Sequence, residues 1–514
     1  MVRRLGIVAL LAAWGGVQGC GDALQFNLII YDPCNQQTLA QADHIQVEIA
    51  DAAGGSLQGT TWEASSGRGE LPNLRPVERA TVSVVLRAAN DGGGPGEALA
   101  ANGVGYLDLG EDAPGPLVEL PVAVGQIDAF MRTTDTTQGS ACSALVASRR
   151  DHTATLLPDG RVFIAGGIQQ TENETVYWDT TELYLPRTGR FVRGPNMGTL
   201  TRRGHTATLL GDGRVLLVGG DGLATDGQGA TTEDTWQVTQ VFNPETEKIQ
   251  TLDLGGDLRT ARAYHTATRL ADGRVLVAGG RADEQALGST EIFDPNAMTF
   301  TEGPELTTAR FYHEAARVGP QTVALVGGRG ADGLLTSIEF VTVGETASAV
   351  AGPQLQTARS HAVAGWLETQ NVLVVAGGFD AVVDKPESGA NGIASVEVVA
   401  LRPSDWSQSF MACDGQMQSP RGAAAAARVD GELLLAGGVG DAGSVVASAE
   451  RVSVSGGGSC EVSSALTRSA LSQPRADFQM TPLVSGDVLV TGGFQQDNGR
   501  PLTLSPGELY IRAR

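Results

Sequence analysis

Histidine and arginine recur together at one position of a pattern that repeats along the chain. These two residue types could bind a metal ion or an anion. Five of the six histidines stand there: His152, His205, His265, His313 and His361. A metal site or a catalytic base needs one histidine in a special place, whereas a residue that returns in every repeat serves the packing of that repeat. We therefore interpret these five histidines as structural and expect no metal ion and no cofactor.

The arginines recur in the same repeats. One arginine precedes or begins each repeat: Arg149, Arg202, Arg262, Arg310, Arg359, Arg421 and Arg475. A glutamate follows later in six of the repeats: Glu182, Glu291, Glu339, Glu397, Glu450 and Glu508. The second repeat has Gln240 in its place. The arginines either form a ring of positive charge for an anionic ligand or pair with these glutamates. We favour pairing, because a partly buried guanidinium is usually held by a carboxylate.

The elements that must position these residues repeat as well. Seven apolar runs end in Gly-Gly, with first glycines at positions 166, 219, 279, 327, 377, 437 and 492. Asp-Gly pairs such as Asp159-Gly160 precede four of these runs, and this dipeptide predicts a tight hairpin turn. Each repeat therefore predicts an inner strand, a Gly-Gly strand, a variable loop, a glutamate-bearing third strand and an outer strand.

The spacing of about 50 residues is typical of the blade of a kelch propeller. Tyr184-Leu-Pro-Arg-Thr-Gly-Arg-Phe191 and the segment from Phe293 to Phe300 resemble the kelch passage from third to fourth strand. The chain thus resembles a kelch-repeat β-propeller of the galactose-oxidase-like type over residues 126–514. The resemblance implies an all-β fold with seven blades. The last blade lacks an outer strand, and we expect residues 126–132 to supply it and close the ring.

The first part of the chain predicts a targeting signal and a second domain. Residues 1–20 have a basic start and a short apolar run that ends at Cys20, as in a bacterial lipoprotein signal peptide. We expect lipidation of Cys20 and a place in the bacterial cell envelope, at the outer membrane, periplasm or cell surface. Residues 21–125 alternate in polarity and predict a small antiparallel β-sandwich. Cys34, Cys142, Cys413 and Cys460 allow two disulfides in any of three pairings.

The net charge of −22 excludes the basic surface that a nucleic-acid-binding protein needs. Binding usually resides in variable loops on a rigid scaffold, here the loops between second and third strands. Candidate ligand-binding residues in or beside them are Tyr177, Trp178, Asp179, Trp236, Tyr264 and Tyr312. We therefore predict a lipid-anchored scaffold that binds a protein or a glycan of the envelope and has no catalytic residues.

An enzyme is the alternative. Copper-radical oxidases of the galactose-oxidase type, which the resemblance brings to mind, need two tyrosines, two histidines and a cysteine linked to one tyrosine. A carbohydrate-active oxidase or hydrolase on the same propeller therefore stays open as a second interpretation. Because the repeat already accounts for the histidines, we favour the non-catalytic one.

Overall fold

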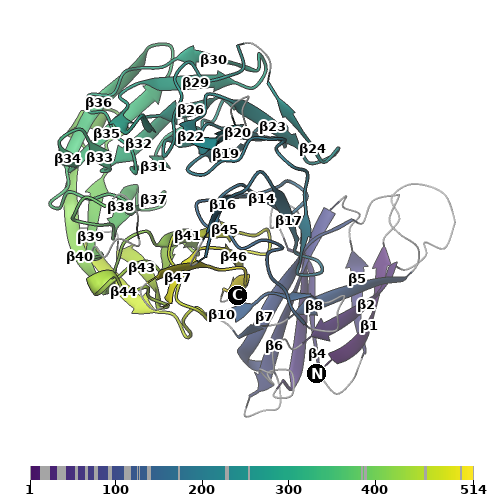
Figure 1. The fold of residues 1–514 in the computed structure, drawn as a ribbon. Coiled ribbons are helices and arrows are strands. Elements are labelled where there is room, and N and C mark those ends of the chain that lie inside the picture. Colours follow the sequence, from purple (N-terminus) through teal and green to yellow (C-terminus); the bar gives the residue numbers. More distant parts are fainter. Residues whose placement is uncertain are drawn as a thin grey trace.

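Seven four-stranded sheets follow one another along the chain and close into a ring (Figure 1). The structure is a computed structural model, and it describes residues 2–11, 24–31, 42–51, 56–63, 68–74, 79–90, 95–108, 117–123, 125–126, 128–135, 141–171, 174–225, 231–252, 255–383, 386, 391–455, 460–497 and 500–512. Within these ranges the helical segments are short 3-10 turns, such as Trp406–Gln408 and Asp441–Gly443. The predicted all-β fold with a seven-bladed propeller is therefore confirmed.

Each blade is an antiparallel sheet whose strands run from the axis outwards in chain order. Blade one contains β13 (Thr153–Leu156), β14 (Val162–Ala165), β17 (Thr181–Leu185) and β18 (Arg190–Arg193). Blade two contains β19 (Thr206–Leu209), β20 (Val215–Val218), β23 (Thr239–Asn243) and β24 (Lys248–Thr251). Blade three contains β25 (Thr266–Arg269), β26 (Val275–Ala278), β29 (Thr290–Asp294) and β30 (Thr299–Glu302). Blade four contains β31 (Glu314–Arg317), β32 (Thr322–Val326), β35 (Ser337–Val343) and β36 (Ala347–Gln354). Blade five contains β37 (Val363–Leu367), β38 (Val372–Ala376), β39 (Ile393–Ala400) and β40 (Phe410–Arg421). Blade six contains β41 (Ala425–Val429), β42 (Glu432–Ala436), β43 (Ala449–Ser455) and β44 (Glu461–Leu466).

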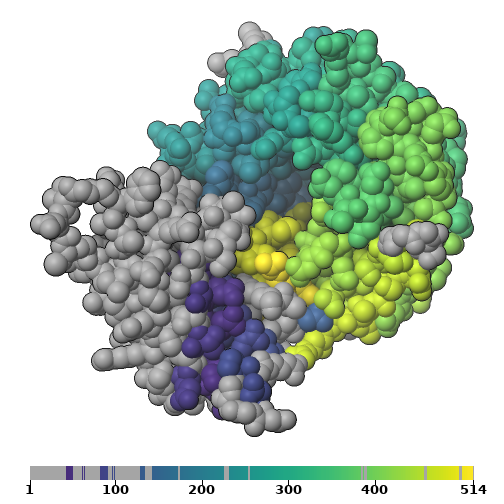
Figure 2. All heavy atoms as spheres, turned by 180° about the vertical axis from the view of Figure 1, so that it is seen from behind, coloured from purple at the N-terminus to yellow at the C-terminus, as the bar shows by residue number. Residues whose placement is uncertain are grey.

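The seventh blade combines both ends of the propeller region. Its strands are β45 (Gln479–Pro482), β46 (Val488–Thr491), β49 (Glu508–Ile511) and β10 (Ala129–Arg132). β10 pairs antiparallel with β49, with Phe130 opposite Tyr510. The outer strand thus comes from the segment that the strand count assigns to it. Figure 2 shows the last blade, in yellow, beside the first ones, in blue, at a central hollow.

The hydrophobic core is divided among the gaps between blades. Seven clusters of buried residues each join two adjacent blades, for example Val162 and Tyr184 of blade one with Leu489 and Leu509 of blade seven. Six of the seven second strands are buried along their whole length, and in the sixth blade only Glu432 at the start of β42 is not, because both faces of these strands meet a neighbouring blade. This explains why the sequence shows continuous apolar runs there rather than alternation.

The Gly-Gly pairs form the seam between blades. The second glycine of each pair donates its N–H to the carbonyl of the next blade's arginine, and Gly493 closes the circle by donating to Arg149 at 2.9 Å. Gly492 has a φ of +65°, and a Cβ atom placed on it would lie 2.3 Å from the Arg149 carbonyl oxygen. Only glycine combines this backbone conformation with so close an approach.

The variable loops contain small hairpins of their own. They are β15 (Ile168–Gln170) with β16 (Thr175–Tyr177), β21 (Asp221–Thr225) with β22 (Thr231–Thr235), β27 (Arg281–Ala282) with β28 (Gln285–Ala286), β33 (Arg329–Gly330) with β34 (Gly333–Leu334), and β47 (Phe494–Asp497) with β48 (Arg500–Thr503). The first residue of each hairpin forms a bridge with the residue that follows a buried arginine, such as Asp221 with Arg203. The hairpins therefore stand at the end of the ring where the inner strands begin.

The region before the propeller holds two further sheets. One contains β4 (Ser56–Glu63), β3 (His44–Asp51), β6 (Arg79–Ala89), β7 (Pro95–Asp108) and β9 (Gly125–Gln126), and all its pairs are antiparallel. The other contains β5 (Arg68–Leu74), β1 (Val2–Leu11), β2 (Leu24–Tyr31) and β8 (Leu117–Ala123). In that sheet the pairs of β1 with β5 and of β2 with β8 are parallel, so the expectation of purely antiparallel strands was wrong for it. Alternation of polarity does not encode strand direction.

The predicted sandwich and signal peptide stay predictions. β1 lies inside the predicted signal peptide and pairs antiparallel with β2 in the full-length chain. Cys20, the predicted lipidation site, lies outside the described residues. No helix in the described ranges is long and apolar enough to cross a membrane.

One disulfide joins Cys413 on β40 to Cys460 just before β44, and so links the outer edges of blades five and six. Cys142 is also disulfide-bonded. Of the three pairings that the sequence allows, the structure therefore selects the one that contains Cys413–Cys460.

Candidate ligand-binding mouth of the propeller

The seven repeated arginines are buried inside the blades, each with no exposed surface. Six of them pair with the third-strand glutamate of their own blade. The pairs are Arg149–Glu182 at 2.7 Å, Arg262–Glu291 at 2.7 Å, Arg310–Glu339 at 2.5 Å, Arg359–Glu397, Arg421–Glu450 at 2.6 Å and Arg475–Glu508 at 2.6 Å. In the second blade Arg202 donates to Gln240 Oε1 at 3.0 Å. The arginines therefore pair within their blades, as the favoured interpretation expects.

Further contacts hold each arginine in place. Arg262 Nη1 donates to the carbonyls of Gly279 at 2.8 Å and Ser289 at 3.0 Å. Glu291 in turn accepts the backbone N–H groups of Arg259 and Thr260 from the incoming loop. The guanidinium thus ties the inner strand, the Gly-Gly strand and the loop together. Burial lowers the pKa of these arginines, and the paired carboxylate opposes that shift. Because these guanidinium groups are already hydrogen-bonded within the blades, they are not available to an anion at the axis.

Four of the five repeated histidines lie between blades. His205 Nε2 contacts Thr153 Oγ1 of the preceding blade at 3.1 Å, and His265 and His313 make the same contact with Thr206 and Thr266 at 3.0 Å. His152 meets Thr491 of blade seven at 3.0 Å. Burial, together with the neighbouring arginine, lowers the pKa of His152 and His265 to about 3, so these rings are neutral at physiological pH.

His361 does not share their position. It lies two residues after its arginine rather than three, and Ala362 occupies the place that His313 has in the preceding blade. The prediction of five equivalent histidines was therefore wrong for His361. The signal was present in the sequence, in the shorter spacing from Arg359.

The residue that precedes the inter-blade histidine lines the entrance to the axis, and we call these residues the mouth ring. It consists of Asp151, Gly204, Tyr264, Tyr312, His361, Ala423 and Asp477. All seven have a φ between 50° and 58°. Neighbours in the ring are joined by backbone hydrogen bonds, from Tyr264 to Gly204 at 2.7 Å onwards to Asp477 and Ala423 at 3.0 Å. Sequence reasoning missed this ring, because a left-handed backbone at so many side-chain-bearing residues leaves no glycine signal.

Three members of the mouth ring form a continuous aromatic cluster, which we call the aromatic stack: the rings of Tyr264 and Tyr312 are tilted by 53°, and those of Tyr312 and His361 are stacked. The ring centroids of Tyr264 and Tyr312 are 4.5 Å apart, and those of Tyr312 and His361 are 4.2 Å apart. Burial and the nearby charge of Asp151 raise the pKa of both tyrosines, so their hydroxyl groups stay protonated. Burial lowers the pKa of His361 to about 4. The stack is therefore neutral and apolar, with hydroxyl groups as its polar edge.

Charged side chains surround this stack on the hairpin side. Arg281 lies 5.1 Å from the Tyr264 ring and pairs with Asp221 at 2.6 Å and with Glu284 at 2.8 Å. Arg203 pairs with Glu233 at 2.5 Å. A small hollow of about 110 Å³ lies among them, lined by Arg203, Tyr264, Arg281, Glu284, Phe311, Tyr312 and Arg329. Two of the predicted binding residues, Tyr264 and Tyr312, therefore share one site, together with His361 and arginines that were not predicted for it.

The other four predicted binding residues lie at the hairpin bases. Trp178 and Trp236 are partly buried and donate their indole N–H to the carbonyls of Ser148 and Thr201. Asp179 accepts the N–H of Met197 through its backbone carbonyl. Tyr177 lies 5.5 Å from the Arg203 guanidinium, and burial raises its pKa to about 12. The two tryptophans cover blade ends, whereas Tyr177 borders the charged rim of the mouth.

Comparison with known proteins agrees with this architecture. Residues 204–438 match the model of the KLHDC2/KLHL20/DRC7 Kelch-repeats domain. A fungal alcohol oxidase of the AA5 family, solved in complex with copper, is similar at 16% identity and a TM-score of 0.54, over 74% of this chain and 75% of that one. A structure described as YjhT is similar at 13% identity and a TM-score of 0.45, over 62% of this chain and 99% of that one. No curated protein matches the chain. The chain is a seven-bladed β-propeller built from kelch repeats.

The side chains at the mouth do not fit the copper centre that the galactose-oxidase resemblance implies. Such a centre needs two histidines and a cysteine beside the tyrosines. The four inter-blade histidines each contact a threonine through Nε2, which leaves His361 as the histidine of the stack. Cys413 and Cys460 are bonded to each other. The described residues contain no group of three or more His, Cys, Asp or Glu side chains that could hold a metal ion.

Proposed function

We propose that the protein binds a glycan of the bacterial cell envelope at the hairpin-bearing mouth of its propeller, without catalysis, while a lipid on Cys20 anchors it to the membrane. The observation that carries the proposal is the aromatic stack of Tyr264, Tyr312 and His361 beside the small charged hollow. Aromatic faces supply a flat apolar contact, and the polar groups beside them orient what is bound.

The chemistry of the rim favours a ligand rich in hydroxyl groups. Arg281 offers donors while its exposed partner Glu284 offers acceptors, and a hydroxyl group needs both. The hollow of about 110 Å³ is smaller than the pockets that enclose whole small molecules. It therefore suits one end group of a longer chain, such as a terminal sugar, whose remaining units would extend over the hairpins.

A glycan array probed with the purified protein tests the binding proposal. Binding to envelope glycans in solution supports it. Capture of an envelope protein with no glycan bound would instead support a protein ligand and contradict the proposal.

Membrane fractionation of cells that produce the wild type and Cys20→Ala tests the anchor. A lipid on Cys20 predicts a membrane-bound wild type and a released variant, because stable anchoring depends on acyl chains. A variant that stays bound to the membrane contradicts the anchor alone and leaves the glycan site untouched.

A further inference from the structure

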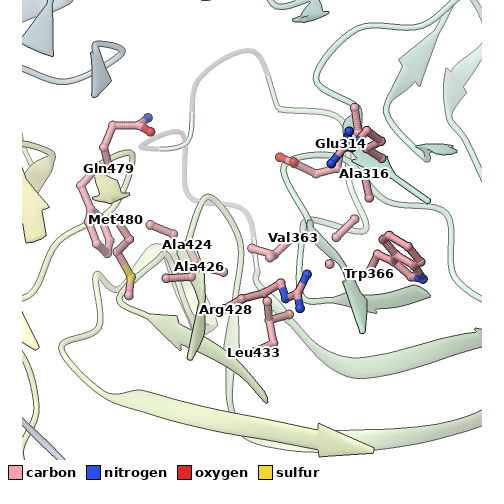
Figure 3. Close-up of a pocket in the computed structure, with 17 residues that line it drawn as sticks. Glu314, Ala316, Val363, Trp366, Ala424, Ala426, Arg428, Leu433, Gln479 and Met480 are labelled. Atoms are coloured by element: carbon pink, nitrogen blue, oxygen red, sulfur yellow. The ribbon is translucent and has the colours of Figure 1, made fainter. Parts of the chain in front are cut away.

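A second cavity lies among the inner strands of blades four to seven and is separate from the hollow at the mouth. It has a volume of about 430 Å³ and is lined by β31, β37, β41 and β45 (Figure 3). Its wall combines polar groups with apolar side chains, among them a run of alanines from Ala424 to Ala427, together with Val363 and Met480. A cavity of this size is in the range that accommodates a small organic molecule.

One carboxyl group, that of Glu314, stands in this wall. Figure 3 shows Glu314 and Trp366 on one side of the cavity and Gln479 and Met480 on the other. In the part of the chain that the structure describes, the Glu314 carboxyl group has no hydrogen bond and no ion pair. The indole N–H of Trp366, which lines the same cavity, is buried and also lacks an acceptor. A buried polar group without a partner, such as this indole N–H, is costly, whereas Glu314 is half-buried and its carboxyl group opens onto the cavity.

The repeat does not explain Glu314. At the same position in the first three blades stand Thr153, Thr206 and Thr266, and each contacts the histidine of the next blade. Blade four has Glu314 instead, and blade five offers Ala362 where that histidine would be. Both halves of the inter-blade contact are thus replaced at this seam, as they are at the next two, but only here does an acidic residue take the place of the threonine. The result is a carboxyl group that faces a cavity instead of a partner.

The charge of the cavity is divided between its two ends. The other charged lining residues, Arg317 and Arg428, are exposed at the far ends of β31 and β41. Arg317 is three residues from Glu314, which is about 10 Å along a strand. Neither arginine neutralises the carboxyl group, so the cavity is complementary to a cation at the Glu314 end and to apolar surface along the alanines.

We propose that this axial cavity binds a small ligand with a primary ammonium group and an apolar body, the ammonium pairing with the Glu314 carboxylate. A charge-assisted hydrogen bond in an apolar surrounding is strong enough to distinguish such a ligand from its neutral and anionic analogues.

The surroundings of Glu314 predict a pH dependence for this binding. Burial raises the pKa of Glu314 to about 8. Of the elements packed against β31, β25 carries Arg269, which donates to the Leu209 carbonyl, and β32 and β37 carry no titratable residue. Because the ammonium group needs an ionised carboxylate, its affinity rises about tenfold per pH unit up to about pH 8 and then levels off.

Isothermal titration with n-hexylammonium tests the proposal, with 1-heptanol and heptanoate as neutral and anionic analogues. We expect the wild type at about pH 9 to bind hexylammonium at least about tenfold more tightly than either analogue. Glu314→Gln should lose that preference, whereas Glu345→Gln, which removes an exposed carboxylate on the surface, should keep it. Ala426→Leu, which keeps Glu314 but narrows the cavity, should weaken binding.

Three results would overturn the proposal. They are no binding of hexylammonium, equal binding of the three probes, or undiminished binding by both Glu314→Gln and Ala426→Leu. The glycan array at the mouth is independent of each of them.

Discussion

Each buried arginine contacts several segments of its blade at once, so its removal leaves a buried carboxylate without its cationic partner. Breaking a buried ion pair from one side is far more damaging than the pair's net contribution suggests, because the remaining charge stays buried. The arginine and glutamate of each repeat therefore act as one structural unit. Their regular spacing in the sequence reflects that unit.

Arg262→Ala should destabilise the protein by about 3–5 kcal/mol, because Glu291 stays buried without its partner. Arg259→Ala is the matched control, since Arg259 and its partner Glu302 are exposed by 56% and 78%, and its cost should stay below about 1 kcal/mol. Thermal and urea unfolding measure both. Equal melting temperatures for the two variants would refute the structural role of the buried pair.

The inter-blade histidines should make the protein sensitive to acid. Burial lowers the pKa of His152 and His265 to about 3, below the unfolded value of 6.5. The unfolded state then binds more protons, so the stabilising contribution is present above pH 6.5 and is lost as the pH falls towards 3. His265→Gln should flatten the dependence of the unfolding free energy on pH in that window by up to about 1.4 kcal/mol per pH unit. An unchanged slope would show that His265 does not titrate with unfolding.

At the scale of strands, the sequence pattern predicts the blades well because each repeat carries its own turn and strand signals. The Asp-Gly turns, the Gly-Gly ends and the glutamate of the third strand all lie where the pattern places them. The hairpins in the variable loops were missed because strands such as Arg281–Ala282 are too short to show periodicity. The parallel pair of β2 with β8 was missed because side-chain alternation is the same for both strand directions.

The candidate site was harder to predict than the blades. Tyr264 and Tyr312 were predicted for the binding face, but their stacking on His361 depends on the curvature of the ring, which brings successive blades together. In the sequence, Glu314 differs from the earlier repeats only by replacing a threonine. Its position in the wall of a cavity, next to Ala362 of the following blade, could be seen only in the structure.

The blade seam can be tested with a pair of glycines. Gly492→Ala places a methyl group 2.3 Å from the Arg149 carbonyl oxygen, at a φ of +65°. Gly431→Ala has a comparable φ of +82° but open space around the new methyl group, so it should cost only the backbone strain of about 1–2 kcal/mol. We expect Gly492→Ala to cost clearly more in thermal unfolding. Equal losses would mean that the seam tolerates a wider spacing.

At the scale of the whole molecule, stability and binding are assigned to different parts of the ring. Seven apolar clusters, one in each gap between blades, hold the scaffold together, and the strand β10 closes it. The binding proposal rests instead on the mouth, where the hairpins vary from blade to blade. A closed ring leaves such loops free to differ, because they contribute little to the clusters beneath them.

The most direct measurement is the affinity of Tyr312→Ala for the glycan that the array identifies, compared with the wild type. Tyr312 contacts both Tyr264 and His361, so its loss disrupts the stack while the blade clusters stay intact. We predict at least about tenfold weaker binding, as for the central aromatic residues of other interfaces. Glu245→Ala, on the exposed Asn243–Glu247 turn, should bind like the wild type. Unchanged binding by a folded Tyr312→Ala variant would contradict the assignment of the mouth as the ligand site.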